Sequence, residues 1–181
     1  MKASFLFFAL TTLLLATSCA SKLTPFTKSM QDDFGWQSED LQRIQFYLSK
    51  DIELRRQLTA GSSEIVSGKI RIENGREVEV ITIPQGTPGV FLFSPKADRF
   101  AVSFEDGPED QYLMFGPNPK VSNRFVLLAS DWERNSGKVR YAGKSYRVSS
   151  DDAYAGLLVD LRKITKTQRQ SRVAQGRKVN R

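Results

Sequence analysis

The sequence contains no histidine, and its 181 residues include a single cysteine. Without histidine the chain can build neither a Ser-His-Asp nor a Cys-His catalytic group, and it has no imidazole ligand for a metal. One cysteine can form neither an internal disulfide nor a thiolate metal cage. These absences exclude much of ordinary enzyme chemistry. We therefore expect a protein that is not an enzyme and that holds no cofactor and no metal.

The remaining composition is that of one folded domain. Aromatic residues make up 10% and charged residues 26% of the chain, which is typical of globular proteins. The net charge of +7 and the sequence pI of about 9.6 are compatible with a nucleic-acid partner. The position of the charge along the chain decides that question.

The first 18 residues have the features of a secretory signal peptide. Lys2 provides a positive start, residues 5–16 are apolar apart from two threonines, and small residues follow. Twelve helical residues extend about 18 Å, against roughly 30 Å of hydrocarbon in a bilayer. The segment is too short for a transmembrane anchor, and we expect it to be removed during export.

This segment ends in Ala16-Thr17-Ser18-Cys19. These residues resemble the lipobox of bacterial lipoproteins, although Ala16 stands where leucine is usual. The resemblance covers residues 1–19 only, and it implies that Cys19 becomes the mature N-terminus and carries lipid such as palmitate. Acyl chains anchor a protein to a membrane without spanning it. The alternative is cleavage after Ala20, which would leave a soluble exported protein without cysteine.

The residues after the cysteine indicate the address of such a lipoprotein. In lipoproteins of bacteria with two membranes, an aspartate directly after the cysteine often means retention at the inner membrane. Here Ala20 occupies that position, which implies the outer membrane. Surface-exported lipoproteins of some groups carry an acidic cluster next to the cysteine. The absence of one in residues 20–24 favours the side that faces the periplasm.

We expect four segments: a signal peptide (1–18), a lipidated N-terminus with a tether (19–33), one α+β domain (34–164) and a basic disordered tail (165–181). Apolar residues at three- and four-residue spacing predict an amphipathic helix over 38–58. A second helix is predicted to begin at Ser150, where Asp151 and Asp152 suit its first turn. Its apolar positions are Tyr154, Leu157, Leu158, Leu161 and Ile164.

Between these helices, about eight short runs with strand-like composition alternate with clusters of Pro, Gly and Asn. They are 66–72, 78–82, 89–94, 99–104, 111–115, 124–130, 138–141 and 145–149. Parallel strands need crossover connections of a dozen or more residues, so this close spacing predicts an antiparallel meander. The strands are short for the deep cup of a lipocalin, and we expect a small filled barrel or a curled sheet.

Two hairpins allow a prediction of register. In the first, a three-residue loop over 73–75 with Gly75 left-handed would place Ile70 opposite Val78. In the last, a two-residue turn at Gly143-Lys144 would place Arg140 opposite Arg147, with Lys138 on the same face. Opposed like charges destabilise a strand pair, so this face is a candidate site for an anion. The alternative is that an acidic residue from a neighbouring strand neutralises it.

The positive charge is concentrated at the C-terminus. Residues 161–181 contain eight basic residues and no acidic one, and the chain without these and Lys2 has 18 basic against 20 acidic residues. Basic arms bind polyanions, and an exported lipoprotein meets lipid headgroups, lipopolysaccharide phosphates, peptidoglycan carboxylates or acidic proteins rather than nucleic acid. A tail without a specific partner is the alternative. The candidate anion-binding residues are Lys138, Arg140, Arg147, Arg162, Lys163, Lys166, Arg169 and Arg172.

Acidic residues provide two further candidates. Four carboxylates fall within 105–110, where a solvated hairpin tip competes with a calcium site that matches no EF-hand spacing. Asp131 and Glu133 flank Trp132, which could stack on a sugar ring. Glycoside hydrolysis needs two carboxylates and no histidine.

Three functions follow from these patterns. The first is a non-enzymatic binding or assembly component of the cell envelope, anchored in the outer membrane, whose basic arm meets an anionic partner. The second is a carboxylate-based hydrolase of cell-wall polysaccharide. The third is a small barrel that holds an apolar ligand in a cavity of several hundred Å³.

Overall fold

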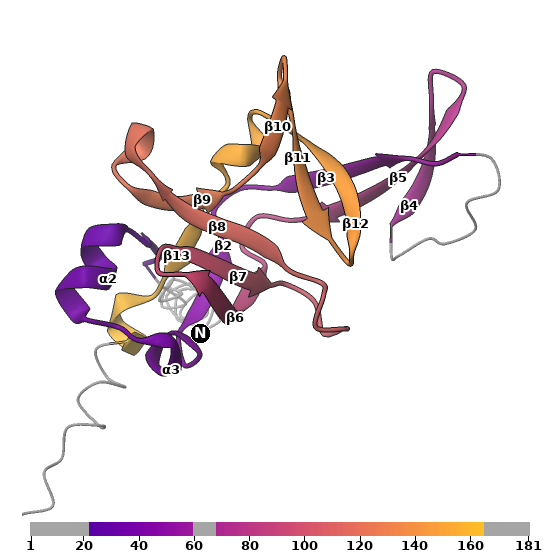
Figure 1. Cartoon of the computed structure of the whole chain (residues 1–181). Helices are drawn as coiled ribbons and strands as arrows, with labels where there is room; N and C mark the ends of the chain where they lie inside the picture. Colours follow the sequence, from indigo (N-terminus) through magenta and orange to yellow (C-terminus); the bar gives the residue numbers. More distant parts are fainter. Residues whose placement is uncertain (1–21, 60–67, 165–181) are drawn as a thin grey trace, which may run out of the picture.

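The computed structural model of the chain describes residues 22–59 and 68–164. Antiparallel strands dominate this part, and its helices are few and short (Figure 1). The fold is therefore mainly β, and the expectation of two long helices is wrong. Cys19 and the tail residues Lys166, Arg169 and Arg172 lie outside the described residues.

The larger sheet has seven strands in the order β1-β13-β2-β6-β7-β8-β9. They are β1 (Thr24–Pro25), β2 (Gln45–Leu48), β6 (Pro88–Lys96), β7 (Arg99–Ser103), β8 (Leu113–Asn118), β9 (Arg124–Leu127) and β13 (Leu157–Val159). The sheet curls until its two edges touch at isolated bridges, where Thr27 pairs with Arg124 and Val126 with Gly156. Within the described residues no continuous ladder joins these edges. Of the two arrangements expected, a curled sheet is therefore found and a closed barrel is not.

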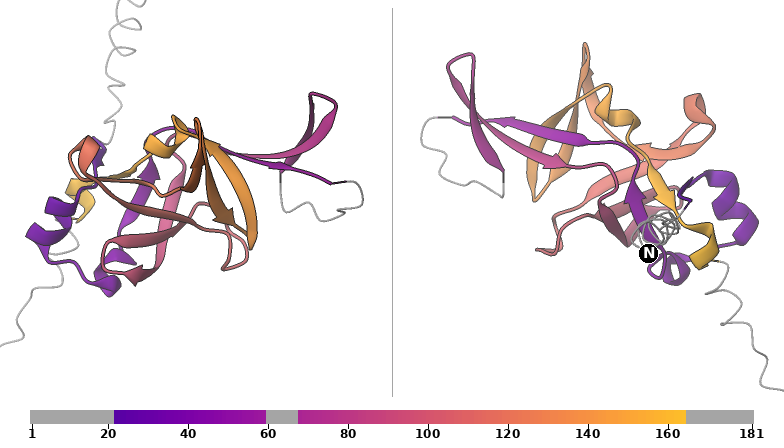
Figure 2. Two further views of the ribbon diagram at one scale, coloured as in Figure 1. Left: turned by 45° about the horizontal axis from the view of Figure 1, so that its top comes forward. Right: turned by 180° about the vertical axis from the view of Figure 1, so that it is seen from behind.

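The smaller sheet has six strands in the order β10-β11-β12-β3-β5-β4. They are β3 (Ile52–Gln57), β4 (Lys69–Glu73), β5 (Arg76–Ile83), β10 (Ser130–Glu133), β11 (Ser136–Tyr141) and β12 (Lys144–Ser149). At one end of this sheet the β4–β5 hairpin projects away from the rest of the molecule, as both views of Figure 2 show. The sheet is weakly joined in its middle, because β12 and β3 share a single residue pair.

The helical elements are α2 (Lys28–Phe34), α3 (Ser38–Leu41), the 3-10 turns η2 (Pro119–Val121) and η3 (Asp152–Tyr154), and a helical turn over 161–164. The Thr27 hydroxyl caps α2 by accepting the Met30 N–H at 3.1 Å, and Gly35 ends it with a φ of 61°. Across 22–59 and 68–164, no helix has both the length and the apolar character that a bilayer crossing requires.

Aromatic side chains make up much of the core. Phe26 is fully buried, and its ring centroid lies 5.0 Å from that of Phe125 and 5.3 Å from that of Phe46. Edge-to-face pairs of this kind add about 0.5–1.5 kcal/mol to the free energy of burial. The buried face of the last hairpin packs into the same cluster with Val139, Tyr141, Tyr146 and Val148, which confirms the face predicted for it.

The predicted helix over 38–58 is wrong beyond its first turn, because β2 and β3 occupy most of that segment. Its apolar residues satisfy both periodicities: Phe46 and Leu48, then Ile52 and Leu54, are buried on alternate positions. The choice between helix and strand is made by distant backbone partners, which β13, β6 and β5 supply.

The predicted helix over 150–164 is also wrong. The segment forms the 3-10 turn η3, then β13 between β1 and β2 in the larger sheet, and only the turn at 161–164 is α-helical. Leu157 and Val159 are buried and Leu158 is half-buried, which is an alternation too short to separate from a helical stripe by sequence. By contrast, all eight predicted strand regions contain a strand.

The folded region begins earlier than expected. Residues 24–34, which the sequence assigns to the tether, contain β1 and α2. Thr24 and Pro25 pair with β13, and Phe26 enters the core behind them. The polar composition of 20–33 conceals this, because Phe26 is the buried anchor of an otherwise exposed or half-buried segment.

Both hairpin registers differ from the prediction. Asn74-Gly75 and Ala142-Gly143 form two-residue turns, and all four residues have a positive φ, as a type I′ turn requires. In the first hairpin Ile70 therefore lies opposite Glu79. The prediction assumed that one face of β4 is buried, but β4 is an exposed edge strand and the turn preference alone sets its register.

In the last hairpin Lys138, not Arg140, lies opposite Arg147. The slip is of two residues, and a slip of two leaves every side chain on its predicted face. Two like charges therefore still oppose each other across this strand pair. Their neighbours decide whether they form an anion site.

Candidate functional site

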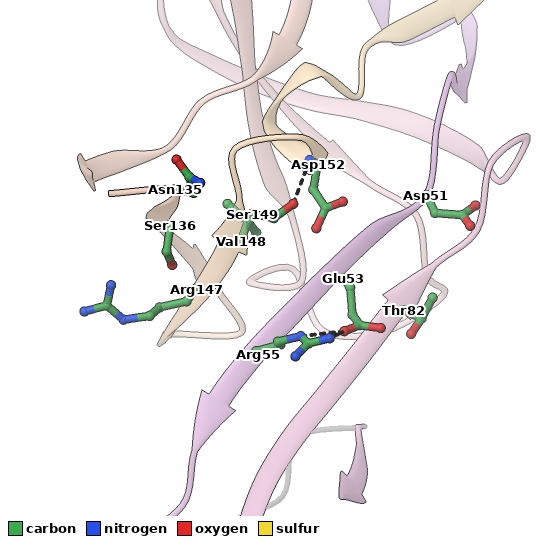
Figure 3. A pocket seen from close by; sticks show the side chains of 10 residues that line it. All are labelled: Asp51, Glu53, Arg55, Thr82, Asn135, Ser136, Arg147, Val148, Ser149 and Asp152. Carbon is green, nitrogen blue, oxygen red and sulfur yellow. Dashed lines mark hydrogen bonds and ion pairs between the residues drawn. The ribbon is translucent and has the colours of Figure 1, made fainter. Parts of the chain in front are cut away.

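A groove of about 500 Å³ opens on the outer face of the smaller sheet, between β3 and β12 (Figure 3). Its walls carry side chains of both charges and several hydroxyl groups. The lining residues are Asp51, Glu53, Arg55, Thr82, Asn135, Ser136, Arg147, Val148, Ser149 and Asp152.

The groove exists because the sheet splits at this point. Arg55 and Arg147 are directly opposite each other, and they are the one residue pair that joins β3 to β12 in the described ladder. The same register would place Glu53 opposite Ser149, but no ladder pair connects them. Each strand instead follows its other neighbour, β5 or β11. The twist of the sheet thus separates two strands whose polar faces line the gap.

Acidic residues of the protein itself flank Arg55. Its Nε donates to Glu53 Oε1 at 2.5 Å, and its Nη1 lies 3.2 Å from both carboxylate oxygens of Glu73. A second arginine, Arg71, lies with its Nη1 3.6 Å from Glu53 Oε2. Exposed ion pairs of this kind contribute at most about 1 kcal/mol each, so a charged ligand can exchange for them at low cost.

Acidic residues of β10 neutralise the predicted basic face. Arg147 Nη2 donates to Glu133 Oε2 at 2.8 Å, and Lys138 Nζ lies 3.6 Å from Asp131 Oδ2. The structure therefore shows the alternative, in which acidic residues of a neighbouring strand neutralise these charges. Arg140 is exposed and forms no ion pair within the described part of the chain. It does not line the groove.

Carboxylates occupy the upper end of the groove. Asp51 Oδ1 accepts the Gln85 N–H at 2.6 Å, and the Asp152 N–H donates to Ser149 Oγ at 3.0 Å. The Asp152 carboxylate points into the space between the strands in Figure 3. Guanidinium groups bind carboxylates and phosphates, and carboxylates bind amines. The groove thus offers both kinds of contact to one ligand.

A buried ion pair supports the groove from the other face of β3. Glu79 is 0% exposed, and Arg56 Nη2 and Nε lie 2.6 Å and 3.0 Å from its Oε2. The Tyr146 hydroxyl donates to the same oxygen at 3.1 Å. Burial, followed by the charge of Glu79, raises the pKa of Tyr146 to about 12, so its hydroxyl keeps its proton at neutral pH. These contacts tie β3, β5 and β12 together beneath the split.

The other predicted site residues are dispersed. Arg162 Nε lies 3.5 Å from Asp160 Oδ1, and Lys163 follows it in the helical turn at 161–164. In the acidic segment 105–110, Glu105 Oε2 accepts the Tyr141 hydroxyl at 2.6 Å. Among the residues that the structure places, no three acidic side chains are close enough together to hold a metal ion.

Sequence reasoning found Arg147 and missed the facing wall of the groove. Glu53, Arg55 and Asp152 were assigned to helices, where they would not share a site with β12. The alternation of Glu53 and Arg55 with buried Ile52 and Leu54 was the available signal. No family model, curated protein or solved structure matches the chain.

Proposed function

We propose that this chain is a lipid-anchored protein of the bacterial outer membrane, facing the periplasm, that acts as a binding or assembly component of the cell envelope. The lipobox-like residues that end at Cys19 support the anchor. The absence of histidine and the single cysteine support binding rather than catalysis. The N-terminal lipid attaches the protein to the membrane. The basic arm, residues 165–181, adds affinity for an anionic envelope component or an acidic protein.

The groove between β3 and β12 supports a more specific assignment of the binding site. Arg55 and Arg147 are register partners on the two strands that border it, with the Arg147 side chain turned toward Glu133. Asp51, Glu53 and Asp152 line the same groove. A ligand with carboxylates and amines in alternation satisfies both sets of charges. The peptide stems of peptidoglycan have this chemistry, and a periplasmic lipoprotein has access to them. We therefore assign the groove to a short zwitterionic peptide of the cell wall.

A pelleting assay with isolated cell-wall sacculi tests this assignment. The full-length chain is solubilised from membranes and mixed with sacculi at raised salt, where attraction by the basic arm is screened. Arg147→Ala and Arg55→Ala should each weaken binding by about tenfold, because each removes a charge-assisted hydrogen bond. Arg140→Ala is the matched control, since it removes an exposed arginine of β11 outside the groove. Equal losses for all three variants, or none, would rule out the groove.

A hydrolase of cell-wall polysaccharide is the second candidate, because three carboxylates line this one groove. It predicts that the wild-type chain releases soluble sugar fragments from sacculi and that Asp152→Asn abolishes the release. Under the binding proposal no fragments are released. Asp152→Asn then changes only the amount of protein that pellets.

Metabolic labelling with palmitate tests the anchor. The wild-type chain should incorporate label and fractionate with the outer membrane, whereas Cys19→Ser should do neither. A labelled Cys19→Ser variant would mean that the lipid is attached elsewhere. An unlabelled wild type that is secreted in soluble form would favour cleavage after Ala20.

A further inference from the structure

The outer strand of the smaller sheet, β4, has an unprotected edge. It ends the strand order, and no strand in the described part of the chain pairs with its outer side. Ile72 is 79% exposed and Ile70 is 46% exposed, although both lie on the face that forms the core elsewhere in the sheet. Natural edge strands are usually covered or interrupted, because their unpaired amides recruit another strand. β4 contains no proline and no bulge.

The turn geometry identifies the backbone groups that face outward. In a hydrogen-bonded turn at Asn74-Gly75, the Glu73 C=O accepts the Arg76 N–H. Because bonding alternates along an antiparallel strand, Lys69, Arg71 and Glu73 direct their amides toward β5. Ile70 and Ile72 direct theirs toward the open side. A partner strand must therefore form its hydrogen bonds with the two isoleucines.

We propose that the partner is a second copy of this chain, whose β4 pairs antiparallel with the first about a two-fold axis at Arg71. Ile70 of each copy then lies opposite Ile72 of the other, and these are the positions with outward amides. Lys69 of each copy lies opposite Glu73 of the other. The strand is thus complementary to itself in both hydrogen bonding and charge, as a two-fold interface requires.

The register follows from the charges and from the length of the strand. A slip of two residues in one direction places Lys69 opposite Arg71, a pair of like charges. A slip of two in the other direction would pair Arg71 with Glu73, but it moves Lys69 and Ile70 out of the strand and against the turn of the other hairpin. The proposed register uses all five strand residues and buries the isoleucines of both copies against each other. Arg71 lies opposite Arg71 of the other copy, and these like charges repel. In each protomer Glu53 Oε2 lies 3.6 Å from Arg71 Nη1 and offsets this repulsion.

The position of the hairpin makes the pairing accessible. Figures 1 and 2 show the β4–β5 hairpin extending from one end of the sheet, away from the rest of the body. Two hairpins can approach edge to edge without contact between the two bodies. The result is one continuous sheet that runs through both molecules.

Disulfide formation in the full-length chain tests the pairing and its register. In a directly opposed pair without hydrogen bonds the Cα atoms are about 4.5 Å apart, which a disulfide spans. Arg71→Cys should therefore give a covalent dimer in membranes treated with a mild oxidant. Residue 70 and its symmetry mate are about 8 Å apart, as are residue 72 and its mate, which is too far for a disulfide. Ile70→Cys and Ile72→Cys are the matched controls, and the wild type reports any dimer that forms through Cys19.

A charge exchange tests the same contact without a new cysteine. Lys69→Glu alone places two acids opposite each other in each half of the interface, and Glu73→Lys alone places two lysines there. Either change should lower the dimer fraction in a sedimentation series several-fold, and the double variant should restore it. Glu73 also lies near Arg55, so Lys69→Glu is the cleaner single variant. Circular dichroism shows whether each variant is folded.

The expected result is dimer from Arg71→Cys only, together with rescue by the charge exchange. Equal crosslinking through residues 70, 71 and 72 would mean random collision and would overturn the proposal. A chain that sediments as a monomer at all concentrations would overturn it too. Crosslinking of Arg71→Cys to a different polypeptide would assign the edge to another partner and reject self-pairing. These outcomes leave the assay on the groove unaffected, because Arg147 is not part of β4.

Discussion

Two consecutive arginines of β3, Arg55 and Arg56, lie in opposite environments. Arg55 points to the outer face and makes exposed ion pairs, whereas Arg56 points to the inner face and holds the buried Glu79. An unpaired buried carboxylate is far more costly than an unpaired exposed one. The two residues therefore differ in importance for stability although they are identical in type.

We predict that Arg56→Met lowers the free energy of unfolding by about 3 kcal/mol, because the buried carboxylate of Glu79 loses the guanidinium that pairs with it. Arg55→Met is the matched control and should cost less than about 1 kcal/mol. Urea denaturation followed by circular dichroism measures both. A double variant, Arg56→Met with Glu79→Leu, should recover much of the loss. If Arg55→Met proved as costly as Arg56→Met, the assignment of the buried pair as a structural clamp would be wrong.

At the scale of elements, each of the eight runs that the sequence predicts as a strand, from their alternation or strand-like composition, contains a strand. It failed where short strands follow one another, because Phe46, Leu48, Ile52 and Leu54 fit a helical stripe as well as two strands. β1 and β13 were not predicted for a related reason, since strands of two and three residues are defined by the strands they pair with. The wall of the groove formed by Glu53 and Arg55 was missed because the sequence assigned β3 to a helix.

Turn chemistry was the other source of error, and it leads to a prediction. Ala142 has a φ of 50° in the last hairpin, a conformation that costs an alanine about 1–2 kcal/mol and that asparagine tolerates better. The first hairpin already carries asparagine at the equivalent position, Asn74. We predict that Ala142→Asn raises the free energy of unfolding by about 0.5–1 kcal/mol, measured by thermal and urea denaturation.

Gly143→Ala provides the opposite control for this turn. Gly143 has a φ of 69°, so an alanine there should destabilise the protein by about 1 kcal/mol. A stabilising effect of Gly143→Ala, or a destabilising effect of Ala142→Asn, would mean that the turn is not type I′ in solution.

At the scale of the whole molecule, the charge is divided between the domain and the tail. In the smaller sheet, acidic residues of β10 pair with Lys138 and Arg147, whereas residues 165–181 contain basic residues and no acidic ones. This division of charge can be predicted from the sequence alone. The groove cannot, because its charged residues come from segments nearly a hundred residues apart.

We predict that removal of residues 165–181 weakens association with anionic lipid vesicles by at least about tenfold at low salt, since each basic residue near such a surface contributes about 1 kcal/mol. At high salt the wild-type and truncated chains should bind alike. A tail in which every Lys and Arg is replaced by Gln serves as the control for length. Vesicle flotation over a salt series measures all three. Binding that is insensitive to both salt and truncation would leave the tail without this role.

The early start of the fold sets how far the protein can reach. Thr24 is already paired with β13, so only about five residues separate it from Cys19, and an extended chain of that length covers at most about 18 Å. A domain of this size is roughly 40 Å across. The proposed acylation of Cys19 would confine the protein to a layer about 60 Å deep along the bilayer. It would then find its partners by lateral diffusion in two dimensions, where even the short edge strand proposed for self-pairing would meet its copy at a high local concentration.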